Sequence, residues 1–188
     1  GMISLYDTKT GELKWRTEHN THPLVRARFS PDGRSFGIGS WEWNVAVWQM
    51  DDLTAPPRVF DFNDVRSYSA VDDFCFSPDA RYIAAATKNN TPRIWEVATG
   101  KLITELKAHR KSVLAIEWSS DGRFIFTAGD EGTIIVWDAD SGEKINKLRG
   151  HLDKVASITI SGDGSKLFTA SSDSSIKEWH PGELLLFT

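Results

Sequence analysis

Residues 109–138 have the sequence HRKSVLAIEWSSDGRFIFTAGDEGTIIVWD, and this stretch decides the fold. It contains three short runs rich in β-branched and aromatic residues, separated by the turn residues Ser119-Ser120-Asp121-Gly122 and Asp130-Glu131-Gly132. Such runs are typical of β-strands that pair through tight turns. A fourth run, Glu143 to Leu148, follows the turn Asp140-Ser141-Gly142. The stretch and its continuation therefore predict one antiparallel sheet of four strands.

The same pattern recurs along the chain at a nearly constant period. An aromatic residue ends the third run of each unit, with separations of 42, 47, 42 and 42 residues, at Tyr6, Trp48, Trp95, Trp137 and Trp179. A turn that resembles Ser-Pro-Asp-Gly precedes the second run four times, at residues 30–33, 77–80, 119–122 and 161–164. The five extra residues between Trp48 and Trp95 include Ala55-Pro56-Pro57, which predicts a surface loop. Two independent markers with one period indicate a repeat protein.

A sheet of four short strands cannot shield both of its faces from water, so neighbouring sheets must pack against each other. The recurring turn, the run Thr133-Ile134-Ile135-Val136-Trp137-Asp138 and the pair Gly150-His151 resemble the WD-repeat β-propeller family. The resemblance covers essentially the whole chain. It implies an all-β propeller of four-stranded antiparallel blades, whose sheets are arranged radially around an axis.

The period divides the chain into a leading half-blade and four blades. Residues 2–21 correspond to the last two strands of a preceding blade, and the four blades follow at residues 22–66, 67–108, 109–150 and 151–188. Residues 183–187 are expected to form the final outer strand. Propellers of this type usually close with about seven blades. We therefore expect an incomplete ring from a longer propeller or one completed by a second copy through open strand edges, with a small closed ring as the third alternative.

The resemblance also implies a structural tetrad of His, Ser or Thr, Asp and Trp in each blade. Its physical logic is that a buried indole N–H needs an acceptor, which a hydroxyl supplies, while imidazole and carboxylate complete the chain of hydrogen bonds. The matching residues are His151, Thr169 (or Ser171), Asp173 and Trp179 in the fourth repeat and His109, Thr127, Glu131 (or Asp130) and Trp137 in the third. Although a His, an acid and a hydroxyl can also form a catalytic triad, their recurrence inside strands favours a structural role.

The first two repeats depart from this pattern. Asn20 and Ser67 stand at the aligned histidine positions, and Glu42 and Asn89 stand at the positions of the acid. The tryptophans Trp48 and Trp95 are retained, so we expect the indole packing without the full set of hydrogen bonds. We therefore predict that these two blades are less rigid.

A partner is expected on the face formed by the loops before the first strand and between the second and third strands. The segment Ser40-Trp41-Glu42-Trp43-Asn44 stands out there, because large aromatic residues that lose water on association are typical interface anchors. The alternative for this segment is that one of its tryptophans fills the space of the missing histidine. The complete set of expected contact residues is Trp41, Trp43, Arg66, Tyr68, Lys88, Lys111, Asp130, Lys154 and Ser172.

These features predict a non-catalytic scaffold for other proteins or peptides, or the sensor part of a larger regulatory protein. No phosphate-binding loop, nucleophile elbow or zinc motif occurs in the sequence, and no cofactor is expected. His19 and His22 are interpreted as loop histidines rather than as half of a metal site. An enzyme built on a propeller would have to use Asp72, Asp73 or Glu117, which lie in first strands. A reader of phosphopeptides or nucleic acid would use Arg26, Arg28 and Arg66, but a formal net charge of -4 disfavours nucleic acid.

The remaining composition bears on the environment of the protein. Cys75 is the single cysteine, so no internal disulfide is expected, and a cytoplasmic or other reducing compartment is the soft inference. No apolar stretch approaches the roughly 18 residues of a membrane span, and no signal peptide opens the chain.

Overall fold

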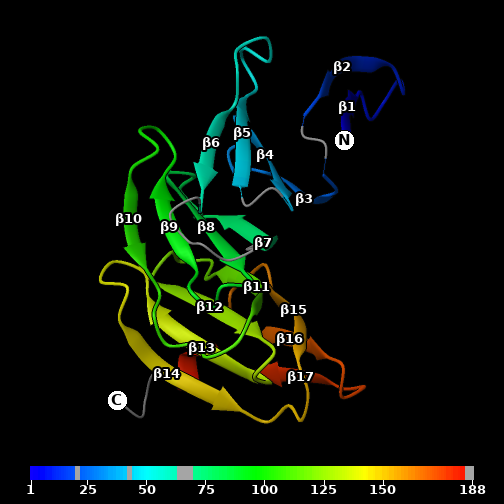
Figure 1. Cartoon of the computed structure of the whole chain (residues 1–188). Helices are drawn as coiled ribbons and strands as arrows, with labels where there is room; N and C mark the ends of the chain where they lie inside the picture. Colours follow the sequence, from blue (N-terminus) through cyan, green and yellow to red (C-terminus); the bar gives the residue numbers. More distant parts are fainter. Residues whose placement is uncertain (20–21, 42–43, 63–69, 185–188) are drawn as a thin grey trace.

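The computed structural model describes residues 1–19, 22–41, 44–62 and 70–184. Its secondary structure is almost entirely β, as predicted, and consists of one two-stranded hairpin followed by four sheets (Figure 1). The hairpin pairs β1 (Met2–Tyr6) with β2 (Leu13–Glu18). The prediction of an all-β propeller of stacked sheets is confirmed.

Each sheet is formed by strands that are consecutive in sequence and antiparallel to their neighbours. Blade one contains β3 (Leu24–Phe29), β4 (Ser35–Ser40), β5 (Asn44–Gln49) and β6 (Arg58–Asp61). Blade two contains β7 (Val71–Phe76), β8 (Tyr82–Thr87), β9 (Arg93–Glu96) and β10 (Leu102–Glu105). Blade three contains β11 (Val113–Trp118), β12 (Phe124–Gly129), β13 (Thr133–Asp138) and β14 (Lys144–Arg149). Blade four contains β15 (Val155–Ile160), β16 (Leu167–Ser171) and β17 (Ile176–Trp179).

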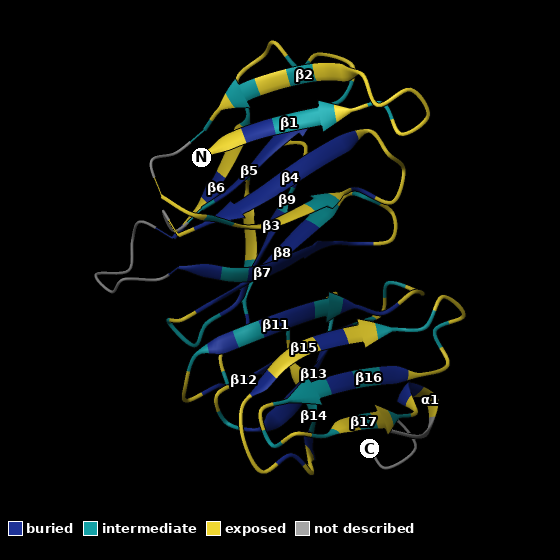
Figure 2. Cartoon of the chain, turned by 90° about the vertical axis from the view of Figure 1, so that its right-hand side faces the viewer, coloured by how far each residue is buried: buried dark blue, intermediate teal, exposed yellow. Residues whose placement is uncertain are grey.

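The blades stand side by side, and their first strands contact one another in the order β3, β7, β11, β15. Buried residues of adjacent blades form shared clusters, such as the one that joins Cys75 and Ile94 of blade two to Trp118 and Trp137 of blade three. Figure 2 shows the hairpin and blade four at opposite ends of this array, so the described residues form an open arc. Cys75 is buried, and burial raises the pKa of its thiol well above the ordinary value.

Two glycines of blade one make room for the next blade. A Cβ atom at Gly37 would lie 2.9 Å from the Phe74 ring, and one at Gly39 would lie 3.2 Å from both Phe74 and Val71. Real Cβ atoms essentially never lie as close as 2.9 Å and rarely as close as 3.2 Å, so the lack of side chains at these two points of β4 lets β7 pack against it. Gly37 and Gly39 therefore serve the packing of blade two against blade one.

The turn between the first and second strands has one construction in all four blades. In blade one, the Ser30 hydroxyl donates to Asp32 Oδ1 at 2.6 Å, and the same oxygen accepts the Arg34 backbone N–H. The fourth residue of the turn has a positive φ, which suits glycine, and it is glycine at residues 33, 122 and 164. Ala80 occupies this place in blade two at φ 59° and bears the strain of a Cβ atom in the left-handed region.

The predicted outer strand of blade four is wrong for the residues that the structure describes. Glu183 and Leu184 belong to the short helix α1 (Pro181–Leu184), and residues 185–188 lie outside the described part of the chain. Pro181 explains the helical turn, because its fixed φ suits the first position of a helix. No helix in the described ranges has the length and apolar character needed to cross a membrane.

Candidate interaction surface

The fourth blade holds a continuous chain of hydrogen bonds around Thr169. His151 Nδ1 lies 2.9 Å from Asp173 Oδ2, and His151 Nε2 lies 2.8 Å from Thr169 Oγ1, which accepts the indole N–H of Trp179 at 2.9 Å. Asp173 also accepts the Ser175 hydroxyl and the Leu152 backbone N–H, and these donors hold the pKa of its carboxyl far below the usual range. The structure therefore joins the loop before β15 to strands β16 and β17. Ser175 is an additional member that the sequence reasoning missed.

Blade three has the same arrangement with a longer contact to the acid. Thr127 Oγ1 lies 2.7 Å from both His109 Nε2 and Trp137 Nε1, whereas His109 Nδ1 lies 3.5 Å from Glu131 Oε1. Burial lowers the pKa of His109 to about 4, so its imidazole is neutral at pH 7. Although burial acts to raise the pKa of Glu131, the Arg110 backbone N–H and Lys147 lower it to about 2. Glu131 and Asp130 were the two acids expected at this place, and it is Glu131 that lies beside the histidine.

The first two blades keep the tryptophan but replace its hydroxyl partner. Ile38 and Ala85 stand in the strand register that Thr127 and Thr169 occupy in the later blades. In blade one, His19 packs edge-on against Trp48 with ring centroids 5.0 Å apart. His19 lies in the loop after β2, as expected, and its partly buried ring also packs on the indole of Trp48, a contact that the sequence did not indicate.

In blade two, Phe62 packs against Trp95 in the same way, with ring centroids 5.0 Å apart, and is fully buried. The guanidinium of Arg93 lies over the Phe62 ring, 5.1 Å from its centre, and forms an ion pair with Glu105 at 2.9 Å. Asn89, at the place of the acid, accepts a hydrogen bond from the Thr87 hydroxyl. Ring packing therefore takes the place of the hydrogen-bond chain around this tryptophan.

The charged residues of the first strands form ion pairs with one another. Arg26 Nε and Arg28 Nη2 lie 3.1 and 3.2 Å from Asp73 Oδ1, and Arg28 Nη1 lies 3.4 Å from Glu117. Asp73 Oδ2 also accepts the backbone N–H of Ile116. Burial raises the pKa of Glu117 to about 6, although Arg28 opposes this effect. Arg26 and Arg28 thus link three blades, which leaves them poorly placed to hold an external phosphate.

The predicted contact residues include one from the same place in each blade. Each follows the second strand directly, and its backbone N–H donates to the carbonyl of the residue before the first strand, at 3.0 to 3.4 Å. These residues are Trp41, Lys88, Asp130 and Ser172, and their carbonyl partners are Pro23, Ala70, Ser112 and Lys154. Since the strands are antiparallel, all of these positions lie at one end of the blades. The predicted residues Trp43, Arg66 and Tyr68 lie outside the described residues.

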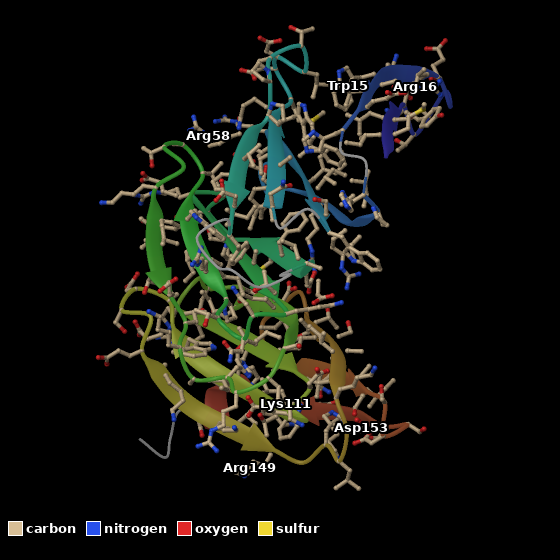
Figure 3. All side chains as sticks on the ribbon, viewed as in Figure 1. Trp15, Arg16, Arg58, Lys111, Arg149 and Asp153 are labelled. Atoms are coloured by element: carbon tan, nitrogen blue, oxygen red, sulfur yellow. The ribbon has the colours of Figure 1, made fainter. Side chains whose placement is uncertain are left out.

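Three blades build one continuous exposed feature at this end. Trp41 is 47% exposed, and Lys88 Nζ lies 5.5 Å from the centre of its ring, so a cation of blade two covers an aromatic face of blade one. Lys88 also lines a hollow of about 440 Å³ together with Arg110, Lys111 and Asp130 of blade three. We call Trp41, Lys88, Arg110, Lys111 and Asp130 the Trp41 surface. Figure 3 labels Lys111 of this surface. Arg58, which lies at the other end of the strands in blade one, is labelled far from it.

A partly buried carboxylate, that of Asp72, lies close enough to this surface to interact with Lys88 and Asp130. Asp72 Oδ2 is inaccessible to water and has no hydrogen-bond partner within the described residues. Burial raises the pKa of Asp72 to about 6, the charge of Lys88 opposes the rise, and Asp130 adds to it. Asp72 is therefore partly protonated near pH 6. Protonation removes part of the negative charge that interacts with the Lys88 ammonium group. Within the described ranges, no three His, Cys, Asp or Glu side chains are placed to hold a metal ion.

Sequence comparison identifies the repeat. The family described as WD domain, G-beta repeat, matches residues 62–96, 100–138 and 142–180, which is more than half of the chain. The chain belongs to the WD-repeat family. The second and third matches each begin before the last strand of one blade and end with, or one residue after, the third strand of the next, so a WD repeat is displaced by one strand from a structural blade.

Curated WD-repeat relatives share about a quarter of their residues with this chain over the matched part. A subunit of chromatin assembly factor 1 from Gallus gallus is 25% identical over 115 residues, which cover 53% of this chain and 20% of that protein. Transcription initiation factor TFIID subunit 5 of Caenorhabditis elegans is 26% identical over 126 residues, 63% of this chain and 18% of the relative. Pre-mRNA-processing factor 17 of Homo sapiens is 26% identical over 109 residues, 57% of this chain and 18% of the relative. The chain therefore spans about a fifth of the length of these relatives.

Proposed function

We propose that this chain is a non-catalytic protein-interaction module that binds an acidic segment of a partner protein on the Trp41 surface. The observation that carries the proposal is the contact between Lys88 and the exposed ring of Trp41, because it places an aromatic anchor and a cation from two blades side by side. Two of the relatives are named as components of larger assemblies, chromatin assembly factor 1 and TFIID, which supports a role of this kind.

The charge of the surface favours an acidic partner. Lys88, Arg110 and Lys111 line the hollow, whereas Asp130 is the acid that accompanies them there. Cations in this arrangement attract carboxylates over distances of about 10 Å at moderate salt, and their effect on partner choice and association rate exceeds their effect on affinity. The aromatic ring supplies the apolar contact, since a half-exposed tryptophan gains by losing its remaining water.

The proposal can be tested with labelled peptides and the full chain. One peptide contains Glu, Phe and Gly, and its counterpart has Lys in place of every Glu. Fluorescence anisotropy should show binding of the acidic peptide that weakens at least tenfold in Trp41→Ala and about fivefold in Lys88→Ala. Tyr6→Ala and Lys101→Ala are the matched controls, because both residues are exposed and lie outside the Trp41 surface.

The control variants should bind the acidic peptide with the affinity of the unchanged chain, and raised salt should weaken that binding. Equal binding by Trp41→Ala and Tyr6→Ala would reject the Trp41 surface as the site. If the lysine peptide binds more tightly than the acidic one and Trp41→Ala abolishes this binding, the surface takes a basic segment and the proposed acidic partner is rejected.

A further inference from the structure

A second hollow lies between blades one and two, at the end of the blades opposite to the Trp41 surface. It is lined by the turns that follow β3 and β7 and by the loops that follow β5 and β9, and its volume is about 600 Å³. The corresponding clefts between blades two and three and between blades three and four measure about 370 and 400 Å³. Of these three clefts, the one at the first junction is the largest, and its volume is within the range of pockets that bind ligands.

The insertion in the repeat builds one wall of this cleft. Asp51, Asp52, Ala55 and Pro56 all line it, and they belong to the loop that lengthens blade one by five residues relative to the other repeats. Asp52 Oδ1 accepts the hydroxyl and backbone N–H of Thr54 and the backbone N–H of Ala55, which folds the loop into a defined shape. The five-residue insertion in blade one thus gives this cleft a wall that the clefts between the other blades lack.

The lining of this cleft carries an excess of negative charge. Its walls contain five carboxylates and three guanidinium groups. Asp32 and Asp79 each interact with the arginine two residues further on, Arg34 and Arg81, so these four charges offset one another. The remaining charged residues of the lining are one cation, Arg58, and three carboxylates, those of Asp51, Asp52 and Glu96.

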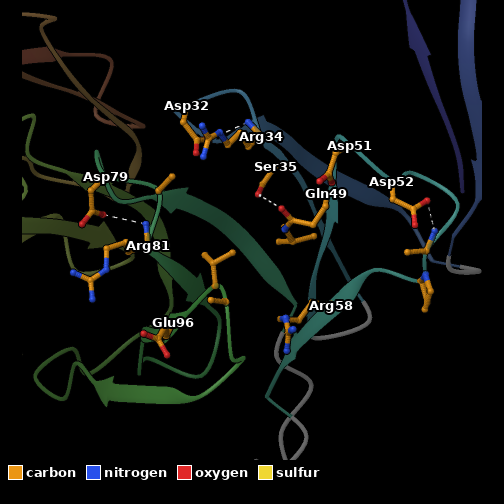
Figure 4. Close-up of a pocket in the computed structure, with 16 residues that line it drawn as sticks. Asp32, Arg34, Ser35, Gln49, Asp51, Asp52, Arg58, Asp79, Arg81 and Glu96 are labelled. Atoms are coloured by element: carbon orange, nitrogen blue, oxygen red, sulfur yellow. Dashed lines mark hydrogen bonds between the residues drawn. The ribbon is translucent and has the colours of Figure 1, made fainter.

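The carboxylates of Asp32 and Asp52 stay ionised at neutral pH, and their Oδ2 atoms remain available to accept hydrogen bonds from a ligand. The Thr54 hydroxyl lowers the pKa of Asp52, and the Ser30 hydroxyl lowers that of Asp32, so both are ionised at neutral pH. The hydrogen bonds of Asp32, Asp52 and Asp79 with their own turns all use Oδ1. Figure 4 shows Asp51 and Asp52 on one side of the cleft and Asp79, Arg81 and Glu96 on the other. A ligand between the blades would meet acidic side chains from both.

The base of the cleft is apolar. Val47 and Val97 are buried beneath it, and Ala55, Pro56 and Ala98 add aliphatic surface to its walls. Long basic side chains suit such a combination, because their methylene groups pack on apolar surface while their charged ends reach carboxylates.

We propose that this cleft is a second docking site, which takes a lysine- or arginine-bearing segment of a partner protein. The site is independent of the Trp41 surface, since it lies at the other end of the strands and shares no residue with it. The two ends of the blades then prefer segments of opposite charge, and the chain can hold both at once.

Binding of a labelled peptide of Lys, Ala and Gly to the full chain tests the site. The variant Asp51→Asn/Glu96→Gln removes two negative charges while the glutamine can still accept the hydrogen bond that Glu96 receives from Thr99. It should weaken binding about fivefold, the effect of losing two exposed charge pairs. Glu12→Gln/Glu143→Gln changes the net charge equally at exposed residues outside the cleft and should change the affinity less than twofold.

A third variant tests whether the charge of the cleft determines the affinity for the peptide. Arg58→Gln removes the cation that lines the cleft with the three acids, so it should raise the affinity for the lysine peptide at least twofold. Lys88→Ala, in the Trp41 surface, should leave this affinity unchanged, which separates the test from that of the proposed function. Equal affinities in the cleft and control variants, or tighter binding of the matching glutamate peptide through Arg58, would overturn the proposal. Circular dichroism on each variant verifies that the fold is retained.

Discussion

The hydroxyl of Thr127 offers a sharp test of what holds the later blades together. Thr127 is completely buried, and its oxygen lies 2.7 Å from both His109 Nε2 and Trp137 Nε1. Replacing Thr127 with valine keeps the volume but exchanges the hydroxyl for a methyl group. The indole N–H then loses its acceptor and the imidazole loses its partner, in a site that water does not reach.

The cost follows from these two losses. A buried polar group without a partner costs about 1–3 kcal/mol, and two groups that share one partner are not fully additive, so we expect about 2–4 kcal/mol. For a domain of this size, that corresponds to a fall in melting temperature of roughly 4–16 °C. Urea denaturation followed by circular dichroism measures the loss, and the slope against urea should stay constant because the surface exposed on unfolding is unchanged.

Blade one supplies the matched control, since Ile38 occupies the same register without a hydroxyl. Ile38→Val removes one buried methylene group and should cost about 1 kcal/mol. If Thr127→Val destabilises the chain no more than Ile38→Val does, the hydrogen-bond chain contributes nothing beyond packing and the reasoning is refuted.

Three further predictions concern single positions. Ala80→Gly should stabilise the chain by about 1 kcal/mol in urea denaturation, because glycine relieves the positive φ of 59° at this turn; a loss of stability would show that the strain is absent. His109→Gln should alter the pH dependence of stability, because the pKa of His109 in the folded chain, about 4, lies below the ordinary value of 6.5. As the pH falls from 6.5 to 4, the unchanged chain should lose about 3 kcal/mol of unfolding free energy relative to the variant. Stability curves of the two proteins that stay parallel over this range would contradict the prediction. Gly37→Ala should destabilise the chain by about 1–3 kcal/mol because its Cβ would meet the Phe74 ring, whereas Gly11→Ala, where no atom lies within 4 Å but φ is 72°, should show only the smaller cost of backbone strain.

The period of the sequence was sufficient to predict the sheets, because the turn residues and the aromatic residue repeat with the same spacing. It could not predict that Pro181 starts a helical turn in place of an outer strand, since the local preference of proline competes there with the pattern of the repeat.

The site was predictable in part. The pattern placed Trp41, Lys88 and Asp130 at corresponding positions, but the contact of Lys88 with the Trp41 ring joins two blades and depends on how those blades pack. His19 was missed because alignment by period selected its neighbour Asn20, whereas contact with Trp48 is what draws a ring into this place. The cleft between blades one and two has no signal in the repeat itself. The inserted loop was visible in the sequence, but the volume that it encloses was not.

Hydrogen–deuterium exchange of the full chain, with and without the glutamate–phenylalanine peptide, tests most directly whether the Trp41 surface receives a partner. Bound peptide should slow exchange in the segments that end β4 and β8 and in the loop before β11, including the backbone amides of Trp41, Lys88 and Lys111. Slowed exchange confined to the turns at the other end of the blades, around Asp32, Asp79 and Asp121, would contradict the proposed surface.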